Sequence, residues 1–297
     1  MKRRDFLKTV ATATVGLRVW PRAALGQPET KTVSTIKTKF VGPRTVAVTA
    51  DGDIYVGCSA RFGGLEKFDR RLTSVWSVGQ EQIRGIAFAP SGEVYATTVT
   101  GKQAIKVFTA SGECRQTVGG PFDGVTGIAV NRRGEIYAVE SSWWPKLGGH
   151  RVQQFDPTGK LLRQWGSVGT APGQFNLPTG IALDHEQNVW VADSYNSRIQ
   201  KFTPDGQFLT AWGAHGAEPG QLNCPQGIAV DSDGNLWVAD TYNNRLQQFT
   251  PTGKLLRTLG RQGTAEGEFW LPCGIAVDAT GTIYVADTMN NRVQVLR

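Results

Sequence analysis

Two arginines, Arg44 and Arg84, occupy equivalent places in this sequence, because each directly precedes a short string of the Gly-Ile-Ala type. The residues that directly precede the four later strings are uncharged: Thr126, Thr179, Gln226 and Cys273. If the six positions converge on one axis, two unpaired guanidinium groups there would form an anion-binding site. The alternative is that Glu81, Asp123 or Glu140 neutralises the two arginines.

A second recurring pair combines an acid with an arginine a few residues later. The acid is found at Glu140, Asp193, Asp240 and Asp287, and the arginine at Arg151, Arg198, Arg245 and Arg292. Both members are absent from the two earlier copies of the motif. Joint presence and joint absence favour a structural ion pair that braces a loop through charge-assisted hydrogen bonds. A ring of metal-binding or catalytic carboxylates is the alternative.

Aromatic residues lie between the members of this pair. In the third copy the connecting stretch is longer than in the later copies and contains Trp143, Trp144 and His150, whereas the fourth and fifth copies carry Tyr195 and Tyr242 there. Such side chains stack on sugars or hold peptides, so we predict that these five residues rim a ligand-binding mouth. The alternative for the longer loop is a lid that plugs the opening.

The elements that position these residues come from an internal repeat. Gly-Ile-Ala strings start at 85, 127, 180, 227 and 274, and a degenerate copy starts at 45. Each copy continues through short β-rich runs separated by Gly, Asp, Asn and Pro turns, without helical periodicity. Four antiparallel strands repeated about every 45 residues indicate an all-β fold, a six-bladed β-propeller. The sixth copy lacks its fourth strand, and we predict that the segment 32–40 supplies it and closes the ring.

This repeat resembles the NHL family. The string GIAVDSDGNLWVADTYNNRLQQF at 227–249 follows that family's pattern, as do 180–202 and 274–295, and the linker GTAPGQFNLPTGIA at 169–182 is equally typical. The resemblance covers essentially all of 31–297 and is weakest in the first two copies. It implies a six-bladed propeller, in agreement with the six copies counted from the residues alone.

The peptidyl-hydroxyglycine lyases are enzymes whose propeller fold is similar to the one expected here. They hold zinc through three histidines placed just before the third strand of several blades. Here that place holds His150 once, and otherwise Ser197, Asn244 and Asn291. One histidine does not make such a zinc site, and the sequence contains no Gly-x-Ser-x-Gly elbow, HExxH motif or phosphate loop. The sequence therefore favours a binding module over an enzyme.

Three of the four cysteines, Cys58, Cys224 and Cys273, map to the face that carries the loops described above, and Cys114 maps to an outer strand. Ring closure would make the first and last blades neighbours, so a Cys58–Cys273 disulfide is one possibility and free thiols the other. The spacing has no CxxC character and does not predict a soft-metal site with His150.

The charge distribution separates a leader from the body. Residues 1–26 carry six bases and one acid, whereas 27–297 carry 26 bases and 24 acids. A near-neutral body argues against a nucleic-acid partner. The start Lys2-Arg3-Arg4-Asp5-Phe6-Leu7-Lys8 resembles the twin-arginine export motif, and Ala24-Leu25-Gly26 offers small residues for cleavage before Gln27. No segment has enough consecutive apolar residues to span a bilayer, so no membrane insertion is expected.

We therefore predict a twin-arginine signal peptide at 1–26 and an NHL-repeat six-bladed β-propeller at 27–297, exported to the periplasm or secreted. The propeller would bind a protein, a peptide or a small anionic ligand at the mouth where the blade-to-blade linkers emerge. No cofactor is expected. The alternative is a metal-dependent hydrolase or lyase at the same mouth, similar to the peptidyl-hydroxyglycine lyases or to lactonases. It would hold a calcium or zinc ion in the channel, with Glu140, Asp193 or His150 among the ligands.

Overall fold

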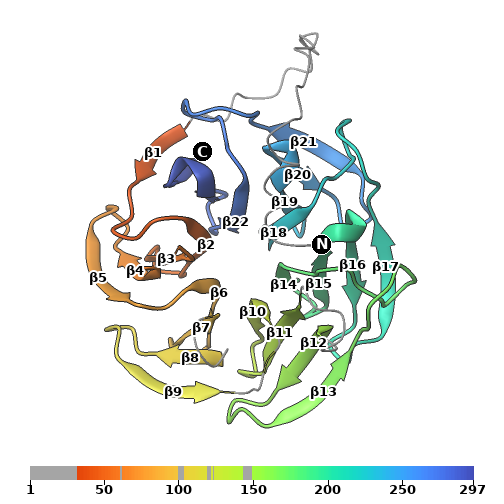
Figure 1. Ribbon diagram of the computed structural model, residues 1–297, viewed down its shortest axis with the longest axis horizontal. Coiled ribbons are helices and arrows are strands. Elements are labelled where there is room, and N and C mark those ends of the chain that lie inside the picture. Colours follow the sequence, from red (N-terminus) through yellow and green to blue (C-terminus); the bar gives the residue numbers. More distant parts are fainter. Residues whose placement is uncertain (1–31, 61, 100–103, 119–121, 123, 143–148) are drawn as a thin grey trace, which may run out of the picture.

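The computed structural model describes residues 32–60, 62–99, 104–118, 122, 124–142 and 149–297. Within them the chain forms six four-stranded antiparallel sheets, which stand like blades around a central axis (Figure 1). The predicted six-bladed, all-β architecture is confirmed. The predicted leader at 1–26 and the rim candidates Trp143 and Trp144 lie outside the described residues. None of the helices in the described part of the chain is long and apolar enough to cross a membrane.

Each blade runs from an innermost to an outermost strand. Blade 1 contains β2 (Pro43–Val48), β3 (Ile54–Cys58), β4 (Gly64–Phe68) and β5 (Ser74–Gly79). Blade 2 contains β6 (Ile83–Phe88), β7 (Val94–Thr98), β8 (Ala104–Phe108) and β9 (Cys114–Val118). Blade 3 contains β10 (Val125–Val130), β11 (Ile136–Ser141), β12 (His150–Phe155) and β13 (Leu161–Trp165). Blade 4 contains β14 (Ile181–Leu183), β15 (Val189–Asp193), β16 (Arg198–Phe202) and β17 (Phe208–Trp212). Blade 5 contains β18 (Pro225–Val230), β19 (Leu236–Asp240), β20 (Arg245–Phe249) and β21 (Leu255–Leu259).

The sixth blade joins the two ends of the described chain. It contains β22 (Pro272–Val277), β23 (Ile283–Asp287), β24 (Arg292–Leu296) and, as its outermost strand, β1 (Thr32–Ile36). Antiparallel pairing of β1 with β24 aligns Ile36 with Val293, so the predicted ring closure is confirmed. The strand is shorter than the predicted 32–40, because the chain then turns into blade 1, where Lys39 N–H donates to the Glu66 carboxylate (2.8 Å).

The core lies between neighbouring blades, where the second strand of each blade is sandwiched. Every residue of β15, β19 and β23 is buried. One hydrophobic cluster packs Trp190 and Ile199 of blade 4 against Ile228 and Leu236 of blade 5. Face-to-face packing of twisted sheets requires such apolar faces on both sides of a strand, which explains why these short strands read as nearly continuous apolar runs.

The glycine of the Gly-Ile-Ala string permits the close approach of the innermost strands. A Cβ atom at Gly227 would lie 2.2 Å from the carbonyl oxygen of Cys273 in the next blade, far inside van der Waals contact. The degenerate first copy has Thr45 instead, and its methyl group occupies space left by Gly57 on β3, where a Cβ would lie 2.6 Å from it. In the first blade the glycine that leaves room is therefore Gly57 on β3, and not the residue at the start of the string on β2.

Three one-turn 3₁₀ helices follow the second strands of blades 4 to 6: η2 (Ser194–Asn196), η3 (Thr241–Asn243) and η4 (Thr288–Asn290). Each ends in a residue with left-handed backbone, at Ser197, Asn244 and Asn291. Asparagine and small polar residues tolerate this conformation better than most other non-glycine residues. These helices lie beside the blade-to-blade linkers, since Tyr195, Tyr242 and Met289 donate backbone hydrogen bonds to them.

Candidate functional site

The central channel is a cavity of about 110 Å³ whose wall is built from the innermost strands of all six blades. The six positions singled out in the sequence lie on this wall: Arg44, Arg84, Thr126, Thr179, Gln226 and Cys273. Residues up to about 230 positions apart therefore meet at one opening, as the repeat alignment required. The two arginines come from the adjacent blades 1 and 2.

Arg44 and Arg84 form no salt bridge with any residue that the structure describes. Arg44 donates one Nη2 hydrogen bond across the channel to the Gln226 side-chain oxygen of blade 5 (2.8 Å). The Nε of Arg84 is buried without a hydrogen-bond partner. Burial, with Arg44 as the second cause, lowers the pKa of Arg84 to about 10, so Arg84 is still a cation at neutral pH.

Two of the three acids that were candidates to neutralise these arginines pair elsewhere. Glu81 forms an ion pair with Lys106, and Glu140 forms one with Arg151 (2.6 Å). Asp123 lies outside the described residues. Among the residues that the structure describes, the channel therefore concentrates positive charge without a carboxylate to balance it.

The opposite wall of the channel is already hydrogen-bonded within the protein. The Thr179 hydroxyl lies 2.7 Å from the Ser194 hydroxyl and donates to the Gln226 carbonyl (3.1 Å), while the Thr126 hydroxyl faces carbonyl oxygens of blades 3 and 4. The Cys273 thiol donates to the Leu271 carbonyl (3.4 Å). These hydroxyl and thiol protons bond to the neighbouring backbone, whereas the two arginines supply charged N–H donors at the channel.

Two tyrosines lie on the linker face near the channel. Tyr195 in η2 is 40% exposed, Tyr242 in η3 is 43% exposed, and their hydroxyl groups lie close enough to perturb each other's pKa. Burial, and then the neighbouring Tyr242, raise the pKa of Tyr195. Burial followed by the nearby Cys224 raises the pKa of Tyr242, while Arg44 acts in the opposite direction. Tyr242 is thus close enough to Arg44 to share its electrostatic environment.

Met289 occupies the same place in η4 as the two tyrosines in η2 and η3, and it is 52% exposed. Sequence reasoning missed it, together with the exposed Trp270 whose carbonyl accepts the Met289 N–H (3.0 Å). Alignment of the repeats could have identified Met289, since it precedes an Asn-Asn pair as Tyr242 does.

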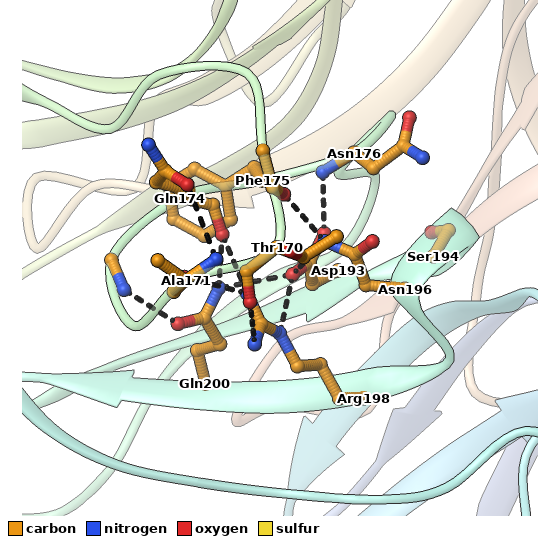
Figure 2. Close-up of polar contacts among 12 residues, drawn as sticks. Thr170, Ala171, Gln174, Phe175, Asn176, Asp193, Ser194, Asn196, Arg198 and Gln200 are labelled. Atoms are coloured by element: carbon orange, nitrogen blue, oxygen red, sulfur yellow. Dashed lines mark hydrogen bonds and ion pairs between the residues drawn. The ribbon is translucent and has the colours of Figure 1, made fainter.

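The acid–arginine pairs are structural, as Figure 2 shows for blade 4. Asp193 is fully buried and accepts hydrogen bonds from Asn176 N–H (2.7 Å), Arg198 Nε (2.7 Å) and Gln200 Nε2 (3.0 Å). The Arg198 guanidinium also donates to three backbone carbonyls of the incoming linker. The same network repeats around Asp240 and Asp287, so these carboxylates hold linkers in place and do not line the channel.

Two expectations about the rim and the thiols need correction. His150 is 3% exposed, with Nε2 2.9 Å from the Ser142 carbonyl oxygen and Nδ1 3.2 Å from that of Phe175, so its ring is held inside blade 3 instead of facing a ligand. The suggested Cys58–Cys273 disulfide does not form, because all four cysteines are free. Cys58 is buried within blade 1, where its thiol contacts the Phe40 carbonyl oxygen (3.5 Å).

No group of three or more His, Cys, Asp or Glu side chains is placed to hold a metal ion in the described part of the chain. The liganding residues suggested for the enzymatic alternative, Glu140, Asp193 and His150, are each engaged in the contacts given above.

Fold and channel together define a six-bladed β-propeller with a cationic central channel. A family model described as NHL repeat matches residues 175–202, 222–249 and 269–296, each of which ends with the third strand of blade 4, 5 or 6. The match is thus confined to the last three blades of this chain. Human NHL repeat-containing protein 3 is 30% identical over 105 residues, a match that covers 31% of this chain and only 29% of that protein.

Solved structures extend the likeness to nearly the whole ring. A streptogramin B lyase superimposes with a TM-score of 0.64 at 15% identity, covering 89% of this chain and 96% of that one. A gluconolactonase from Xanthomonas campestris gives a TM-score of 0.69 at 16% identity, covering 91% and 95%. At these identities the likeness shows the common fold alone, because one fold hosts many activities.

Proposed function

We propose that this propeller is an exported binding module that takes a ligand or protein partner at the linker-side mouth of its central channel. The observation that carries the proposal is the pair Arg44 and Arg84, whose guanidinium groups share the channel without a carboxylate partner among the described residues. Arginine is well suited to this role, since its planar fork of donors matches carboxylate and phosphate oxygens.

Physical reasoning favours a ligand over a purely structural role for these arginines. A buried charge without a counter-charge costs stability, and arginines that serve the fold are paired, as Arg198 is with Asp193. Arg84 instead keeps an unpartnered Nε at the channel wall and lies beside a second cation. An anion entering the channel would supply the missing acceptors and lower the electrostatic cost.

The test uses the propeller as purified from 27–297 and two simple probes, acetate and inorganic phosphate. A ligand that binds only the folded state raises the melting temperature with concentration. We expect at least one of the two anions to stabilise the wild-type protein, and this effect to be lost in the double variant Arg44→Met/Arg84→Met. Arg115→Met is the matched control, because Arg115 lies on an outer strand with its side chain 61% exposed. Equal stabilisation of all three proteins would overturn the proposal.

The enzymatic alternative at the same mouth is tested on the same protein sample. A metal-dependent hydrolase or lyase requires a stoichiometric zinc or calcium ion, which mass spectrometry of the native protein would detect. A stoichiometric metal ion retained by the wild-type protein would favour the enzyme over the anion-binding module.

A further inference from the structure

Three exposed apolar side chains stand in register on the linker face of blades 4 to 6. They are Tyr195, Tyr242 and Met289, which are 40%, 43% and 52% exposed and occupy the middle of η2, η3 and η4. We call these three residues the apolar ledge. Scattered exposed apolar residues need no explanation, but adjacent ones mark binding surfaces.

The members of the ledge are neighbours. The hydroxyl groups of Tyr195 and Tyr242 lie close enough across the boundary between blades 4 and 5 to perturb each other's pKa. Because η4 is anchored to its linker by the same backbone hydrogen bond as η3, we infer from the pseudo-symmetry of the ring that Met289 follows Tyr242 as Tyr242 follows Tyr195. Trp270, 42% exposed, continues the apolar surface next to Met289.

The ledge adjoins the cations of the channel. Arg44 belongs to blade 1, but its guanidinium reaches across the channel to Gln226 of blade 5, the blade that carries Tyr242. The positive charge of Arg44 accordingly acts to lower the pKa of Tyr242. The mouth is therefore two-sided, with positive charge at its centre and an apolar surface along the rim of blades 4 to 6.

We propose that the mouth binds an amphipathic organic carboxylate, whose carboxylate group enters the channel between Arg44 and Arg84 and whose apolar body lies on the ledge. A channel of about 110 Å³ accommodates a carboxylate group and a few water molecules but not a whole aromatic acid, so the body must remain outside. A carboxylate suits a single free guanidinium fork, since it accepts two parallel hydrogen bonds. This inference rests on the proposed function and adds the chemical class of the ligand.

Three small probes separate the two halves of such a ligand. Acetate carries the carboxylate group alone, 3-phenylpropan-1-ol carries the apolar body alone, and 3-phenylpropanoate carries both. Burial of a phenyl ring predicts that 3-phenylpropanoate binds at least roughly tenfold more tightly than acetate, and the alcohol at least roughly tenfold more weakly than the acid. Dissociation constants would be measured by calorimetry or by competition.

The chain offers a direct reporter of where the body lies. It contains two methionines, Met1 in the predicted leader and Met289 on the ledge, so protein 27–297 labelled with ¹³C in the methionine methyl group carries Met289 as its native label. An aromatic ring seated on the ledge shifts this methyl signal by its ring current. We expect a saturable shift with 3-phenylpropanoate and none with acetate.

Two variants and two controls complete the experiment. Tyr242→Ala should remove most of the advantage of 3-phenylpropanoate over acetate, whereas Arg84→Met should weaken both acids. Phe208→Ala, an exposed aromatic on the outermost strand of blade 4, and Arg115→Met should change neither.

The outcomes distinguish this inference from the proposed function. If acetate binding depends on Arg84 but 3-phenylpropanoate binds no better and Tyr242→Ala has no effect, the amphipathic ligand is refuted and the anion site stands. If neither acid binds and the arginine variants behave as wild type, both proposals are refuted.

Discussion

Replacing Arg84 with methionine should stabilise the protein, although most substitutions destabilise. Methionine keeps the length of the side chain and removes the charge. The pKa of Arg84 is lowered from 12.5 to about 10, mainly by burial, so the charged form is penalised in the folded state and the penalty is present in full below pH 10. At about 1.4 kcal/mol per pKa unit, the shift from 12.5 to about 10 corresponds to at most about 3.5 kcal/mol.

The measurement is the free energy of unfolding in urea at pH 7, in a buffer with little chloride or other small anion. We expect Arg84→Met to gain about 1 to 3 kcal/mol, or roughly 2 to 5 °C in melting temperature for a chain of this size. The gain should shrink when a binding anion is added, because the anion stabilises only the wild-type protein.

The same substitution at a paired arginine supplies the matched control. Arg245 donates its Nε to the fully buried Asp240 (2.7 Å) and its other nitrogens to three backbone carbonyls. Arg245→Met should therefore cost about 3 to 5 kcal/mol, because it leaves a buried carboxylate unpaired. If Arg84→Met destabilises the protein like Arg245→Met, then Arg84 serves the fold and the reasoning for an anion site fails.

Four further outcomes follow from the same structure. A thiol reagent should modify Cys114 at once and the other three cysteines only after unfolding, because Cys114 alone is exposed; rapid reaction of a second thiol would contradict this burial. Burial raises the pKa of Cys58 and of Cys224 from 9.0 to about 12, so the unfolded chain releases these protons first and stability falls as pH rises from 9 to 12. The slope should be shallower by up to about 1.4 kcal/mol per pH unit for each thiol replaced by alanine. Deleting β1 should lower the melting temperature and promote self-association through the uncovered edge of β24, and a variant that stays monomeric and equally stable would show that ring closure does not depend on it. Replacing Arg3 and Arg4 with lysine should trap the precursor in the cytoplasm, as cell fractionation would show, and unimpaired export would refute the twin-arginine leader.

The repeat made much of the site predictable. Six aligned copies were enough to place Arg44, Arg84 and Gln226 on one channel wall, because rotational pseudo-symmetry turns equal positions in the repeat into neighbours around the axis. The acid–arginine pairs were interpreted correctly for the same reason, since Asp193 and Arg198 face each other in one hairpin.

Burial was less predictable. His150 matched a rim position by alignment, yet its ring turns inward to two carbonyl groups of its own and the next blade. Met289 was missed because a methionine does not resemble the tyrosines at its register, although the fold exposes all three alike. Side-chain exposure depends on which blade packs on which side, and the alignment contains no such information.

The sequence by itself determined the turns, the strand period and the number of blades, because these follow from local chemistry such as the left-handed glycine and the aspartate that closes the turn at Asp231–Gly234. Only the tertiary structure decided the electrostatics of the channel. Whether an arginine has a counter-charge depends on side chains far away in the chain, as the hydrogen bond of Arg44 with Gln226 illustrates. Charge–charge interactions act through space and vary with burial, so they are set by the closed ring and not by any single repeat.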